Sequence, residues 1–137
     1  MKIGLYGKNF KNGSSVYLQQ LVDKIRSMGG GLYVYEPAYE QLSKMVSISC
    51  EPVFFNTYED ICGQLDCLLS VGGDGTLLDT ITLVRDSGIP VFGINMGRMG
   101  FLSSIAKDEI IPALDCIASG DYTIEERTLL HLDSDNA

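Results

Sequence analysis

Two kinds of pattern follow one another along the chain: short, nearly continuous apolar runs, and longer segments in which apolar residues recur every three or four positions. The runs are typical of strands covered on both faces, and the spaced segments are typical of helices that bury one side. We predict strands at residues 2–6, 32–35, 53–55, 67–71 and 89–94, and helices at residues 14–28, 37–46, 77–86 and 108–119.

Strands that alternate with helices of about 10–15 residues predict a parallel sheet with right-handed crossovers and helices on both faces. The expected fold class is therefore α/β, a Rossmann-like three-layer domain with a mostly parallel sheet. Ligands of such sheets bind at the carboxyl ends of the strands. We expect this nucleotide-binding domain at residues 1–120. Residues 121–137 alternate again like a strand, and we expect them to lead into a further domain that these residues do not contain.

Composition narrows the classes of protein to which this chain can belong. Its 137 residues suit one ordinary domain, and 45% hydrophobic against 20% charged residues are enough to fill a core. No apolar run approaches the ~20 residues that span a bilayer, and the start of the chain lacks the long apolar stretch of a signal peptide. We therefore expect a cytoplasmic protein with no membrane partner.

The charge balance sets a condition on any anionic ligand. The 10 lysines and arginines against 18 aspartates and glutamates give a net charge of −8. Such a field repels nucleic acid and anionic membranes, so neither is expected as a partner. A phosphorylated ligand needs a local attraction, from backbone N–H groups at a helix start, a bridging divalent cation or a few placed basic residues.

The four cysteines, Cys50, Cys62, Cys67 and Cys116, show no C-x-x-C spacing, and the lone His131 lies far from them in sequence. This spacing argues against a metal cluster and against a disulfide framework. We expect reduced thiols, most of them buried, and no metal site built from protein side chains alone.

The strongest local signal follows the predicted strand at residues 67–71. Residues 72–76 read Gly-Gly-Asp-Gly-Thr, a stretch in which three glycines surround one acid. Residues without a Cβ let the chain turn sharply and let a phosphate or sugar approach the backbone N–H groups closely. Gly-Asp-Gly alone also suits an ordinary turn. The whole stretch, between a buried strand and a helix, favours an anion-binding loop, although it matches neither the Rossmann G-x-G-x-x-G nor a Walker motif.

Three side chains near this loop have more specific expected roles. Thr76 and Asp79 have the spacing of a capping box, so we expect a helix to start there with its positive end toward the loop. Asp74 is the one carboxylate among the glycines, where it can accept a hydrogen bond from a substrate hydroxyl and orient it for attack on a phosphoryl group. Because phosphoryl transfer has a loose transition state, a carboxylate of ordinary basicity suffices.

Residues 72–76 match the GGDGT signature that NAD kinases share with diacylglycerol and sphingosine kinases, and phosphofructokinases carry a near variant. Residues 93–102, GINMGRMGFL, resemble a second segment, GIN-x-G-x-L-G-F-L, which is typical of NAD kinases and not of lipid kinases. With the Glu-Glu-Arg at residues 125–127, the resemblance covers nearly the whole chain in element order. The chain therefore resembles the amino-terminal domain of NAD kinases, within the phosphofructokinase-like superfamily.

This resemblance implies an enzyme that transfers a phosphoryl group from ATP or polyphosphate to the adenosine 2′-hydroxyl of NAD, with a divalent cation such as Mg²⁺. It further implies that Asp74 is the proton acceptor, that Leu78 and Phe101 flank the adenine, and that Asn95 and Gly97 shape their loop. The nucleotide-binding residues so implied are Gly72, Gly73, Asp74, Gly75, Thr76, Leu78, Asp79, Asn95, Gly97 and Phe101.

Two positions depart from the family's pattern. Met99 replaces the usual leucine, which is a mild, volume-conserving change. Asp79 stands where many relatives carry a basic residue that assists binding. Lys8 or Arg98 could compensate for the lost cation, although a solvated surface charge is the commoner state of such residues.

NAD kinases also carry a second, mostly β domain with an Asn-acid pair, and these 137 residues contain no such segment. We therefore expect the chain to be inactive alone. The resemblance implies that the full-length protein is a homodimer or homotetramer that acts on the small molecules NAD and ATP in NADP biosynthesis.

Two other functions fit parts of the pattern. The amino-terminal domain of a lipid kinase would carry the same glycine loop, but it favours a basic or apolar surface toward the membrane, and the net charge of −8 argues against that. A non-catalytic nucleotide-binding module would use the loop only to bind. Asp74→Asn separates such a module from a kinase, because the module has no turnover to lose.

Overall fold

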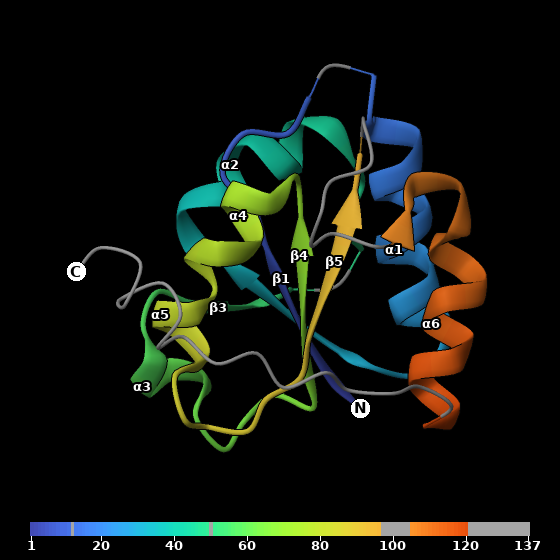
Figure 1. Cartoon of the computed structure of the whole chain (residues 1–137). Coiled ribbons are helices and arrows are strands. Elements are labelled where there is room, and N and C mark those ends of the chain that lie inside the picture. Colours follow the sequence, from blue (N-terminus) through green and yellow to red (C-terminus); the bar gives the residue numbers. More distant parts are fainter. Residues whose placement is uncertain (12, 50, 97–104, 121–137) are drawn as a thin grey trace.

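Six parallel strands form the centre of the structure, and helices cover both faces of the sheet (Figure 1). This computed structural model describes residues 1–11, 13–49, 51–96 and 105–120. The strands are β1 (Lys2–Tyr6), β2 (Gly31–Tyr35), β3 (Val53–Phe55), β4 (Cys67–Val71), β5 (Val91–Asn95) and β6 (Ile105–Ala106). The helices are α1 (Ser15–Ser27), α2 (Glu36–Met45), α3 (Tyr58–Ile61), α4 (Asp74–Asp79), α5 (Ile81–Val84) and α6 (Ile110–Ser119), with a 3-10 turn at Lys107–Glu109.

The strand order is β3-β2-β1-β4-β5-β6, so the direction of winding reverses between β1 and β4. The chain first adds strands on one side of β1 and then crosses to add β4, β5 and β6 on the other. Leu5 pairs with both Val34 of β2 and Leu69 of β4, which fixes the register across the reversal. Ligands of doubly wound sheets bind where the winding reverses, outside the carboxyl ends of the strands.

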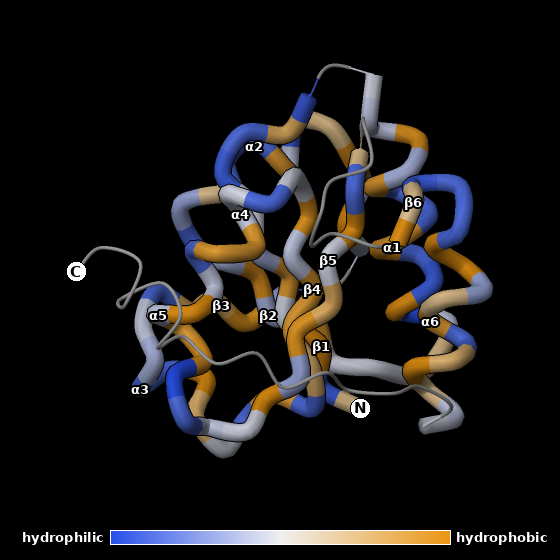
Figure 2. Tube along the Cα trace, in the orientation of Figure 1, coloured by the Kyte–Doolittle hydropathy of each residue, from blue (hydrophilic) through white to orange (hydrophobic). Residues whose placement is uncertain are grey.

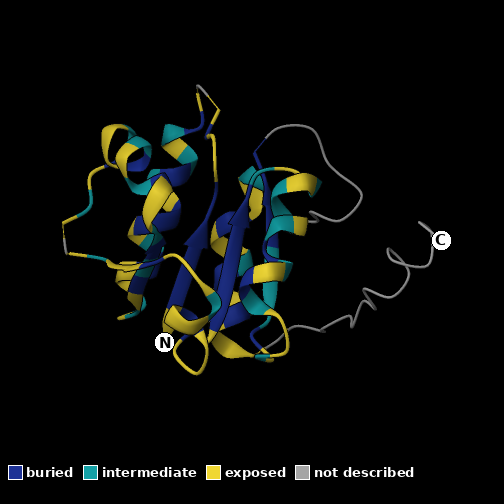
Figure 3. Cartoon of the chain, turned by 90° about the vertical axis from the view of Figure 1, so that its left-hand side faces the viewer, coloured by how far each residue is buried: buried dark blue, intermediate teal, exposed yellow. Residues whose placement is uncertain are grey.

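The two faces of the sheet carry separate hydrophobic clusters, because successive side chains of a strand point to opposite faces. One cluster joins alternate residues of β1, β2 and β4 to α1, α2 and α6, with Leu18, Leu42 and Leu114 as examples from the three helices. The other joins the sheet to α3 and α5 through Ile61 and Leu83. Figure 2 shows hydrophobic residues gathered along the strands, and Figure 3 shows the strands buried between outward-facing, exposed helix surfaces.

The predicted α/β class, with a parallel sheet and helices on both faces, is confirmed. Four strands and the possible strand at residues 53–55 lie within two residues of their predicted bounds. The predicted helix at residues 77–86 was wrong in its bounds: helix begins at Asp74, is interrupted at Thr80 and ends at Val84. The short α3 and β6 were not predicted.

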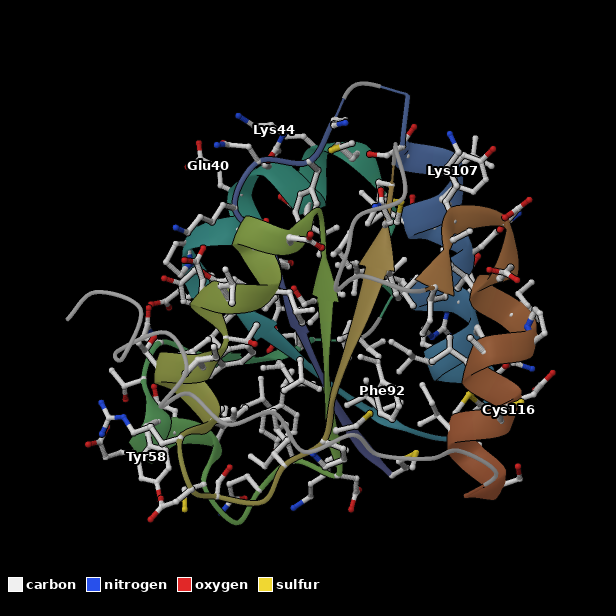
Figure 4. The ribbon with its side chains drawn as sticks, viewed as in Figure 1. Glu40, Lys44, Tyr58, Phe92, Lys107 and Cys116 are labelled. Carbon is white, nitrogen blue, oxygen red and sulfur yellow. The ribbon has the colours of Figure 1, made fainter. Side chains whose placement is uncertain are left out.

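The cysteines are less buried than the sequence led us to expect. Of those that the structure describes, Cys67 is buried in β4, whereas Cys62 and Cys116 are exposed free thiols. Cys116 lies on α6, which covers the outside of the sheet (Figure 4). The buried side of this helix consists of Ile110, Leu114 and Ile117, so Cys116 lies on the side that faces solvent. Among the described residues, no helix is both long and apolar enough to cross a bilayer.

Thiol reactivity should follow this burial. Burial raises the pKa of the Cys67 thiol to about 12, so at about pH 8 it is almost entirely protonated and unreactive. We expect iodoacetamide to modify Cys62 and Cys116 in the folded protein, and Cys67 only after denaturation, as measured by peptide mass spectrometry. Equal labelling of all three thiols before denaturation would contradict the described packing of β4.

Candidate functional site

The glycine loop leaves the carboxyl end of β4 through a bend that needs glycine. Gly72 has φ +150°, a backbone region that residues with a side chain rarely adopt. A Cβ on Gly72 would lie 2.6 Å from Thr76 Oγ1 and 3.0 Å from Thr76 Cβ. The Gly72 N–H donates a 2.9 Å hydrogen bond to the carbonyl of Ile94, so the bend is also tied to the end of β5.

Helix α4 begins directly after this bend, and not at Thr76. Gly73 is its N-cap and Asp74 its first residue, with no side-chain hydrogen bond capping the helix. The predicted capping box of Thr76 and Asp79 was therefore wrong. The bend at Gly72 already turns the chain into the helix, which places Thr76 inside the first turn against that glycine. With only six residues, α4 also has a smaller dipole than the predicted helix would have had.

The structure brings several of the predicted site residues to one edge of the sheet. Asp74 is half-buried on the first turn of α4, and Leu78, four residues later, is 41% exposed on the same side of the helix. Asn95 is buried at the end of β5, one residue after the Ile94 carbonyl that binds the loop. Gly97 and Phe101 lie outside the described residues, as does Arg98.

Gly73 and Gly75 differ from Gly72 in that the fold has room for a side chain at both positions. Both are exposed, and a Cβ added to either would meet nothing within 4 Å. The fold itself therefore does not require them. Open space where a side chain would stand is what a loop that lets a ligand approach its backbone closely would present.

The loop after β1 meets the glycine loop at the point where the winding reverses. A Cβ on Gly7 would lie 3.3 Å from the carbonyl oxygen of Val71 and would clash with the ring of Phe10. The Phe10 N–H donates to Gln41 Oε1 at 3.0 Å, and Gln41 Nε2 donates to the Phe10 carbonyl at 2.9 Å. Gln41 thus fixes the segment that follows Lys8 onto α2.

A cleft of about 350 Å³ opens beside these loops. It is lined by the ends of β1 and β2, the segment after β3, and one side of α4 and α5. Its lining includes the rings of Tyr6 and Tyr35, whose centroids are 4.6 Å apart. The lining residues are Tyr6, Lys8, Tyr35, Asn56, Leu78, Asp79, Thr82 and Leu83. Aromatic rings together with a few polar groups are typical of small-molecule sites, and this cleft lies at the carboxyl ends of parallel strands, where such sheets bind their ligands.

The cleft contains an ion pair that connects the two loops. Lys8 Nζ lies 2.8 Å from Asp79 Oδ2, and hydrogen bonding and attraction to this carboxylate raise the pKa of Lys8. Asp79 also interacts with the phenol of Tyr6. Burial is the main cause that raises the pKa of Tyr6, and the charge and hydrogen bond of Asp79 raise it further. Asp79 therefore holds a cation and a neutral hydroxyl together at the mouth of the cleft.

Sequence reasoning considered Lys8 and missed most of the other cleft residues. Tyr6, Tyr35 and Asn56 come at or just after the ends of three parallel strands, and that position was the available signal. Asn56 is held by a true capping box at the start of α3, because its N–H and that of Thr57 both donate to Asp60 Oδ2. These hydrogen bonds lower the pKa of Asp60. A second hollow, of about 380 Å³, lies over α1 and shares no lining residue with this cleft.

Two neighbouring glycines provide a matched test of the bend. Gly72→Ala forces a side chain into an unfavourable φ and against Thr76, so we expect it to lower the free energy of unfolding by about 1–3 kcal/mol. Gly73→Ala meets open space and should change it by less than about 0.5 kcal/mol. Chemical denaturation of both variants measures the difference. Equal effects would contradict the described bend.

The ion pair at the cleft has a measurable electrostatic effect. We expect Asp79→Asn to lower the pKa of Lys8 toward its ordinary value, because the carboxylate that favours the charged ammonium is gone. NMR titration of the lysine side chain measures this shift. Asp86→Asn, which removes a carboxylate bonded to Tyr58 outside the cleft, should leave the pKa of Lys8 unchanged. An unchanged pKa in Asp79→Asn would show that the pair does not form in solution.

Comparisons with known proteins identify the family of this chain. Residues 18–122 match the family model described as the ATP-NAD kinase N-terminal domain. The chain is 36% identical over 132 residues to the NAD kinase of Flavobacterium psychrophilum, covering 96% of this chain and 45% of that protein. It is 36% identical over 140 residues to the NAD kinase of Cytophaga hutchinsonii, covering 98% and 46%. The chain thus spans less than half the length of these relatives.

The fold has a counterpart among solved structures. Yeast NADH kinase complexed with NADH is similar with a TM-score of 0.71 at 18% sequence identity, over 88% of this chain and 38% of that one. At such low identity the likeness supports the fold alone. The family model matches most of the chain, and the resemblance first seen at residues 72–76 and 93–102 is thereby confirmed. This chain belongs to the NAD kinase family.

Proposed function

We propose that the complete protein carrying this chain is an NAD kinase, which transfers a phosphoryl group from ATP to the adenosine 2′-hydroxyl of NAD to form NADP. The observation that carries this proposal is the position of Asp74. It begins α4 directly after the glycine bend, where the winding of the sheet reverses, in a chain of the NAD kinase family. Family membership also favours this function over that of a lipid kinase.

Asp74 is proposed as the group that accepts the proton of the attacking 2′-hydroxyl. Its place on a first helical turn gives it a fixed backbone, while Gly73 and Gly75 on either side leave room for a ribose to approach. Phosphoryl transfer requires mainly that the nucleophile be positioned in line with the phosphorus. A carboxylate that orients the hydroxyl and takes its proton late in the reaction meets that requirement.

The remaining predicted site residues keep their proposed roles. The N–H groups of the glycine loop would contact the dinucleotide, and Leu78, exposed on the same side of α4 as Asp74, would contact the adenine together with Phe101. Asn95 and Gly97 would shape the neighbouring loop. The yeast NADH kinase that shares the fold was solved with NADH, which supports a dinucleotide as the ligand.

Mg²⁺ and the phosphoryl donor belong to the proposal as well. We propose that the ion arrives with the donor's phosphates, since Mg²⁺ in nucleotide sites keeps several waters and takes few protein ligands. Asp74 is the carboxylate that would reach it, and the ion would neutralise charge on the phosphates. ATP is the donor that we propose, with polyphosphate as an alternative to be compared in the same assay.

The organisation of the complete protein is proposed from the family resemblance. We propose that residues 1–120 are the nucleotide-binding domain and that residues 121–137 connect it to a second, mostly β domain, on which activity would depend. The complete protein would act in the cytoplasm as a homodimer or homotetramer. Light scattering of the complete protein would measure its assembly.

Asp74→Asn tests the proposed chemistry in the complete protein. Loss of the proton acceptor should lower kcat about 10²–10⁴-fold while the Kd for NAD changes little, because the amide keeps the size and a hydrogen-bond acceptor. NADP formation from NAD and MgATP is followed with an NADP-specific dehydrogenase, and NAD binding by calorimetry. Asp23→Asn, an exposed residue of α1, is the matched control. Full turnover in Asp74→Asn would contradict the role of Asp74, and no turnover in the unchanged protein would contradict the function.

A further inference from the structure

Lys8 occupies a fixed place between the two loops at the reversal of winding. It follows Gly7, which abuts the Val71 carbonyl one residue before the glycine bend. Two residues after Lys8, Phe10 is held to α2 by both hydrogen bonds of Gln41. The short segment that carries Lys8 is therefore held at both ends, and Lys8 lines the cleft.

The ammonium of Lys8 can donate more hydrogen bonds than its ion pair uses. A lysine ammonium carries three N–H donors, and one of them is directed to Asp79 at 2.8 Å. The Lys8 side chain remains 55% exposed, so its other donors are accessible to a ligand in the cleft. Asp79 in turn contacts the buried Tyr6, which limits where the carboxylate, and hence the ammonium, can be.

The charge of the chain makes this cation significant. With a net charge of −8, the protein repels an anionic nucleotide unless a local positive group attracts it. Lys8 is the only basic residue among the described residues that line the cleft. The cleft is lined by Leu78 and Asp79 at the carboxyl end of α4, and the glycine loop lies at the amino end of the same six-residue helix.

We propose that Lys8, positioned by Asp79, donates hydrogen bonds to a phosphate group of a nucleotide bound where the winding reverses. This inference rests on the proposed kinase function. In this proposal, Lys8 in the loop after β1 takes the place of the basic residue that the family resemblance leads one to expect at position 79. Asp79 is then a positioning residue. Both substrates contain phosphates: the triphosphate of ATP and the pyrophosphate of NAD. The experiment distinguishes which of them Lys8 binds.

A purely structural ion pair predicts a different result. Exposed ion pairs contribute little to stability, and if Lys8 and Asp79 only connect the loop to α4, removing Lys8 changes no substrate's KM selectively. A phosphate-binding lysine predicts a selective effect. Its removal raises the KM of the one nucleotide whose phosphate it contacts and leaves the KM of the other nearly unchanged.

The test uses Lys8→Met and Lys8→Arg in the complete protein, with KM measured separately for MgATP and NAD. For Lys8→Met we expect the KM of one nucleotide to rise about tenfold or more, because a charge-assisted hydrogen bond is lost. Lys8→Arg should recover most of that loss. Lys44→Met is the matched control, since Lys44 pairs with Glu40 at 3.5 Å on the exposed side of α2 (Figure 4). It should leave both KM values unchanged.

A second variant moves the cation to α4. Lys8→Met combined with Asp79→Arg supplies a positive group from the other side of the same cleft, and we expect it to recover at least part of the lost affinity. Unchanged KM values in Lys8→Met, or an equal change in both, would overturn the inference. If the unchanged protein makes no NADP, calorimetric titration of ATP and NAD into the unchanged protein and Lys8→Met still decides it. Equal affinities in the two proteins would then reject the role of Lys8.

Discussion

β1 and β4 are hydrogen-bonded neighbours, yet the chain leaves them toward opposite edges of the sheet. The connections after the two strands therefore diverge, and no crossover helix can close the space between them. At this place the chain bends sharply at Gly72, and Gly7 approaches the carbonyl of Val71 closely. The cleft and its ion pair lie between the ends of β1 and β2 on one side and α4 and α5 on the other, and the proposed catalytic carboxylate, Asp74, begins α4.

The sheet and the site differ in how firmly they are held. β4 is buried along its whole length, and its neighbours pack against helices on both sides. α4, in contrast, has no buried residue and is fixed by the bend before it, the buried Thr80 after it and the ion pair of Asp79 with Lys8. A rigid sheet thus carries a partly exposed helix, an arrangement that suits a surface where a ligand binds.

Five of the six strands and the position of the glycine loop could be predicted because each depends on a local pattern. A continuous apolar run such as residues 67–71 indicates a strand that is buried on both faces, and Gly72 indicates the bend that follows it. The helix start could not be predicted in the same way. Thr76 and Asp79 have capping-box spacing, but Thr76 packs against Gly72 and Asp79 pairs with Lys8. The spacing that does form a capping box belongs to Thr57 and Asp60.

The cleft depended on contacts between segments far apart in sequence. Nothing near Lys8 in the chain indicates that Asp79 will be its partner, because the pairing follows from the strand order and not from spacing. For that reason the compensating cation at position 8 could be considered from the sequence but not assigned. Residues 97–104, which include Gly97 and Phe101, lie outside the described residues, so those two assignments stay predictions.

Gln41 illustrates how far the influence of such a site can extend. It lies on α2 and does not line the cleft, yet both hydrogen bonds of its amide hold the backbone of Phe10 in place. A glutamate there could accept from the Phe10 N–H but could not donate to the carbonyl, and a leucine could do neither. In a survey of tolerated substitutions, this glutamine would therefore rank with the ligand-binding positions, although it lies outside the cleft.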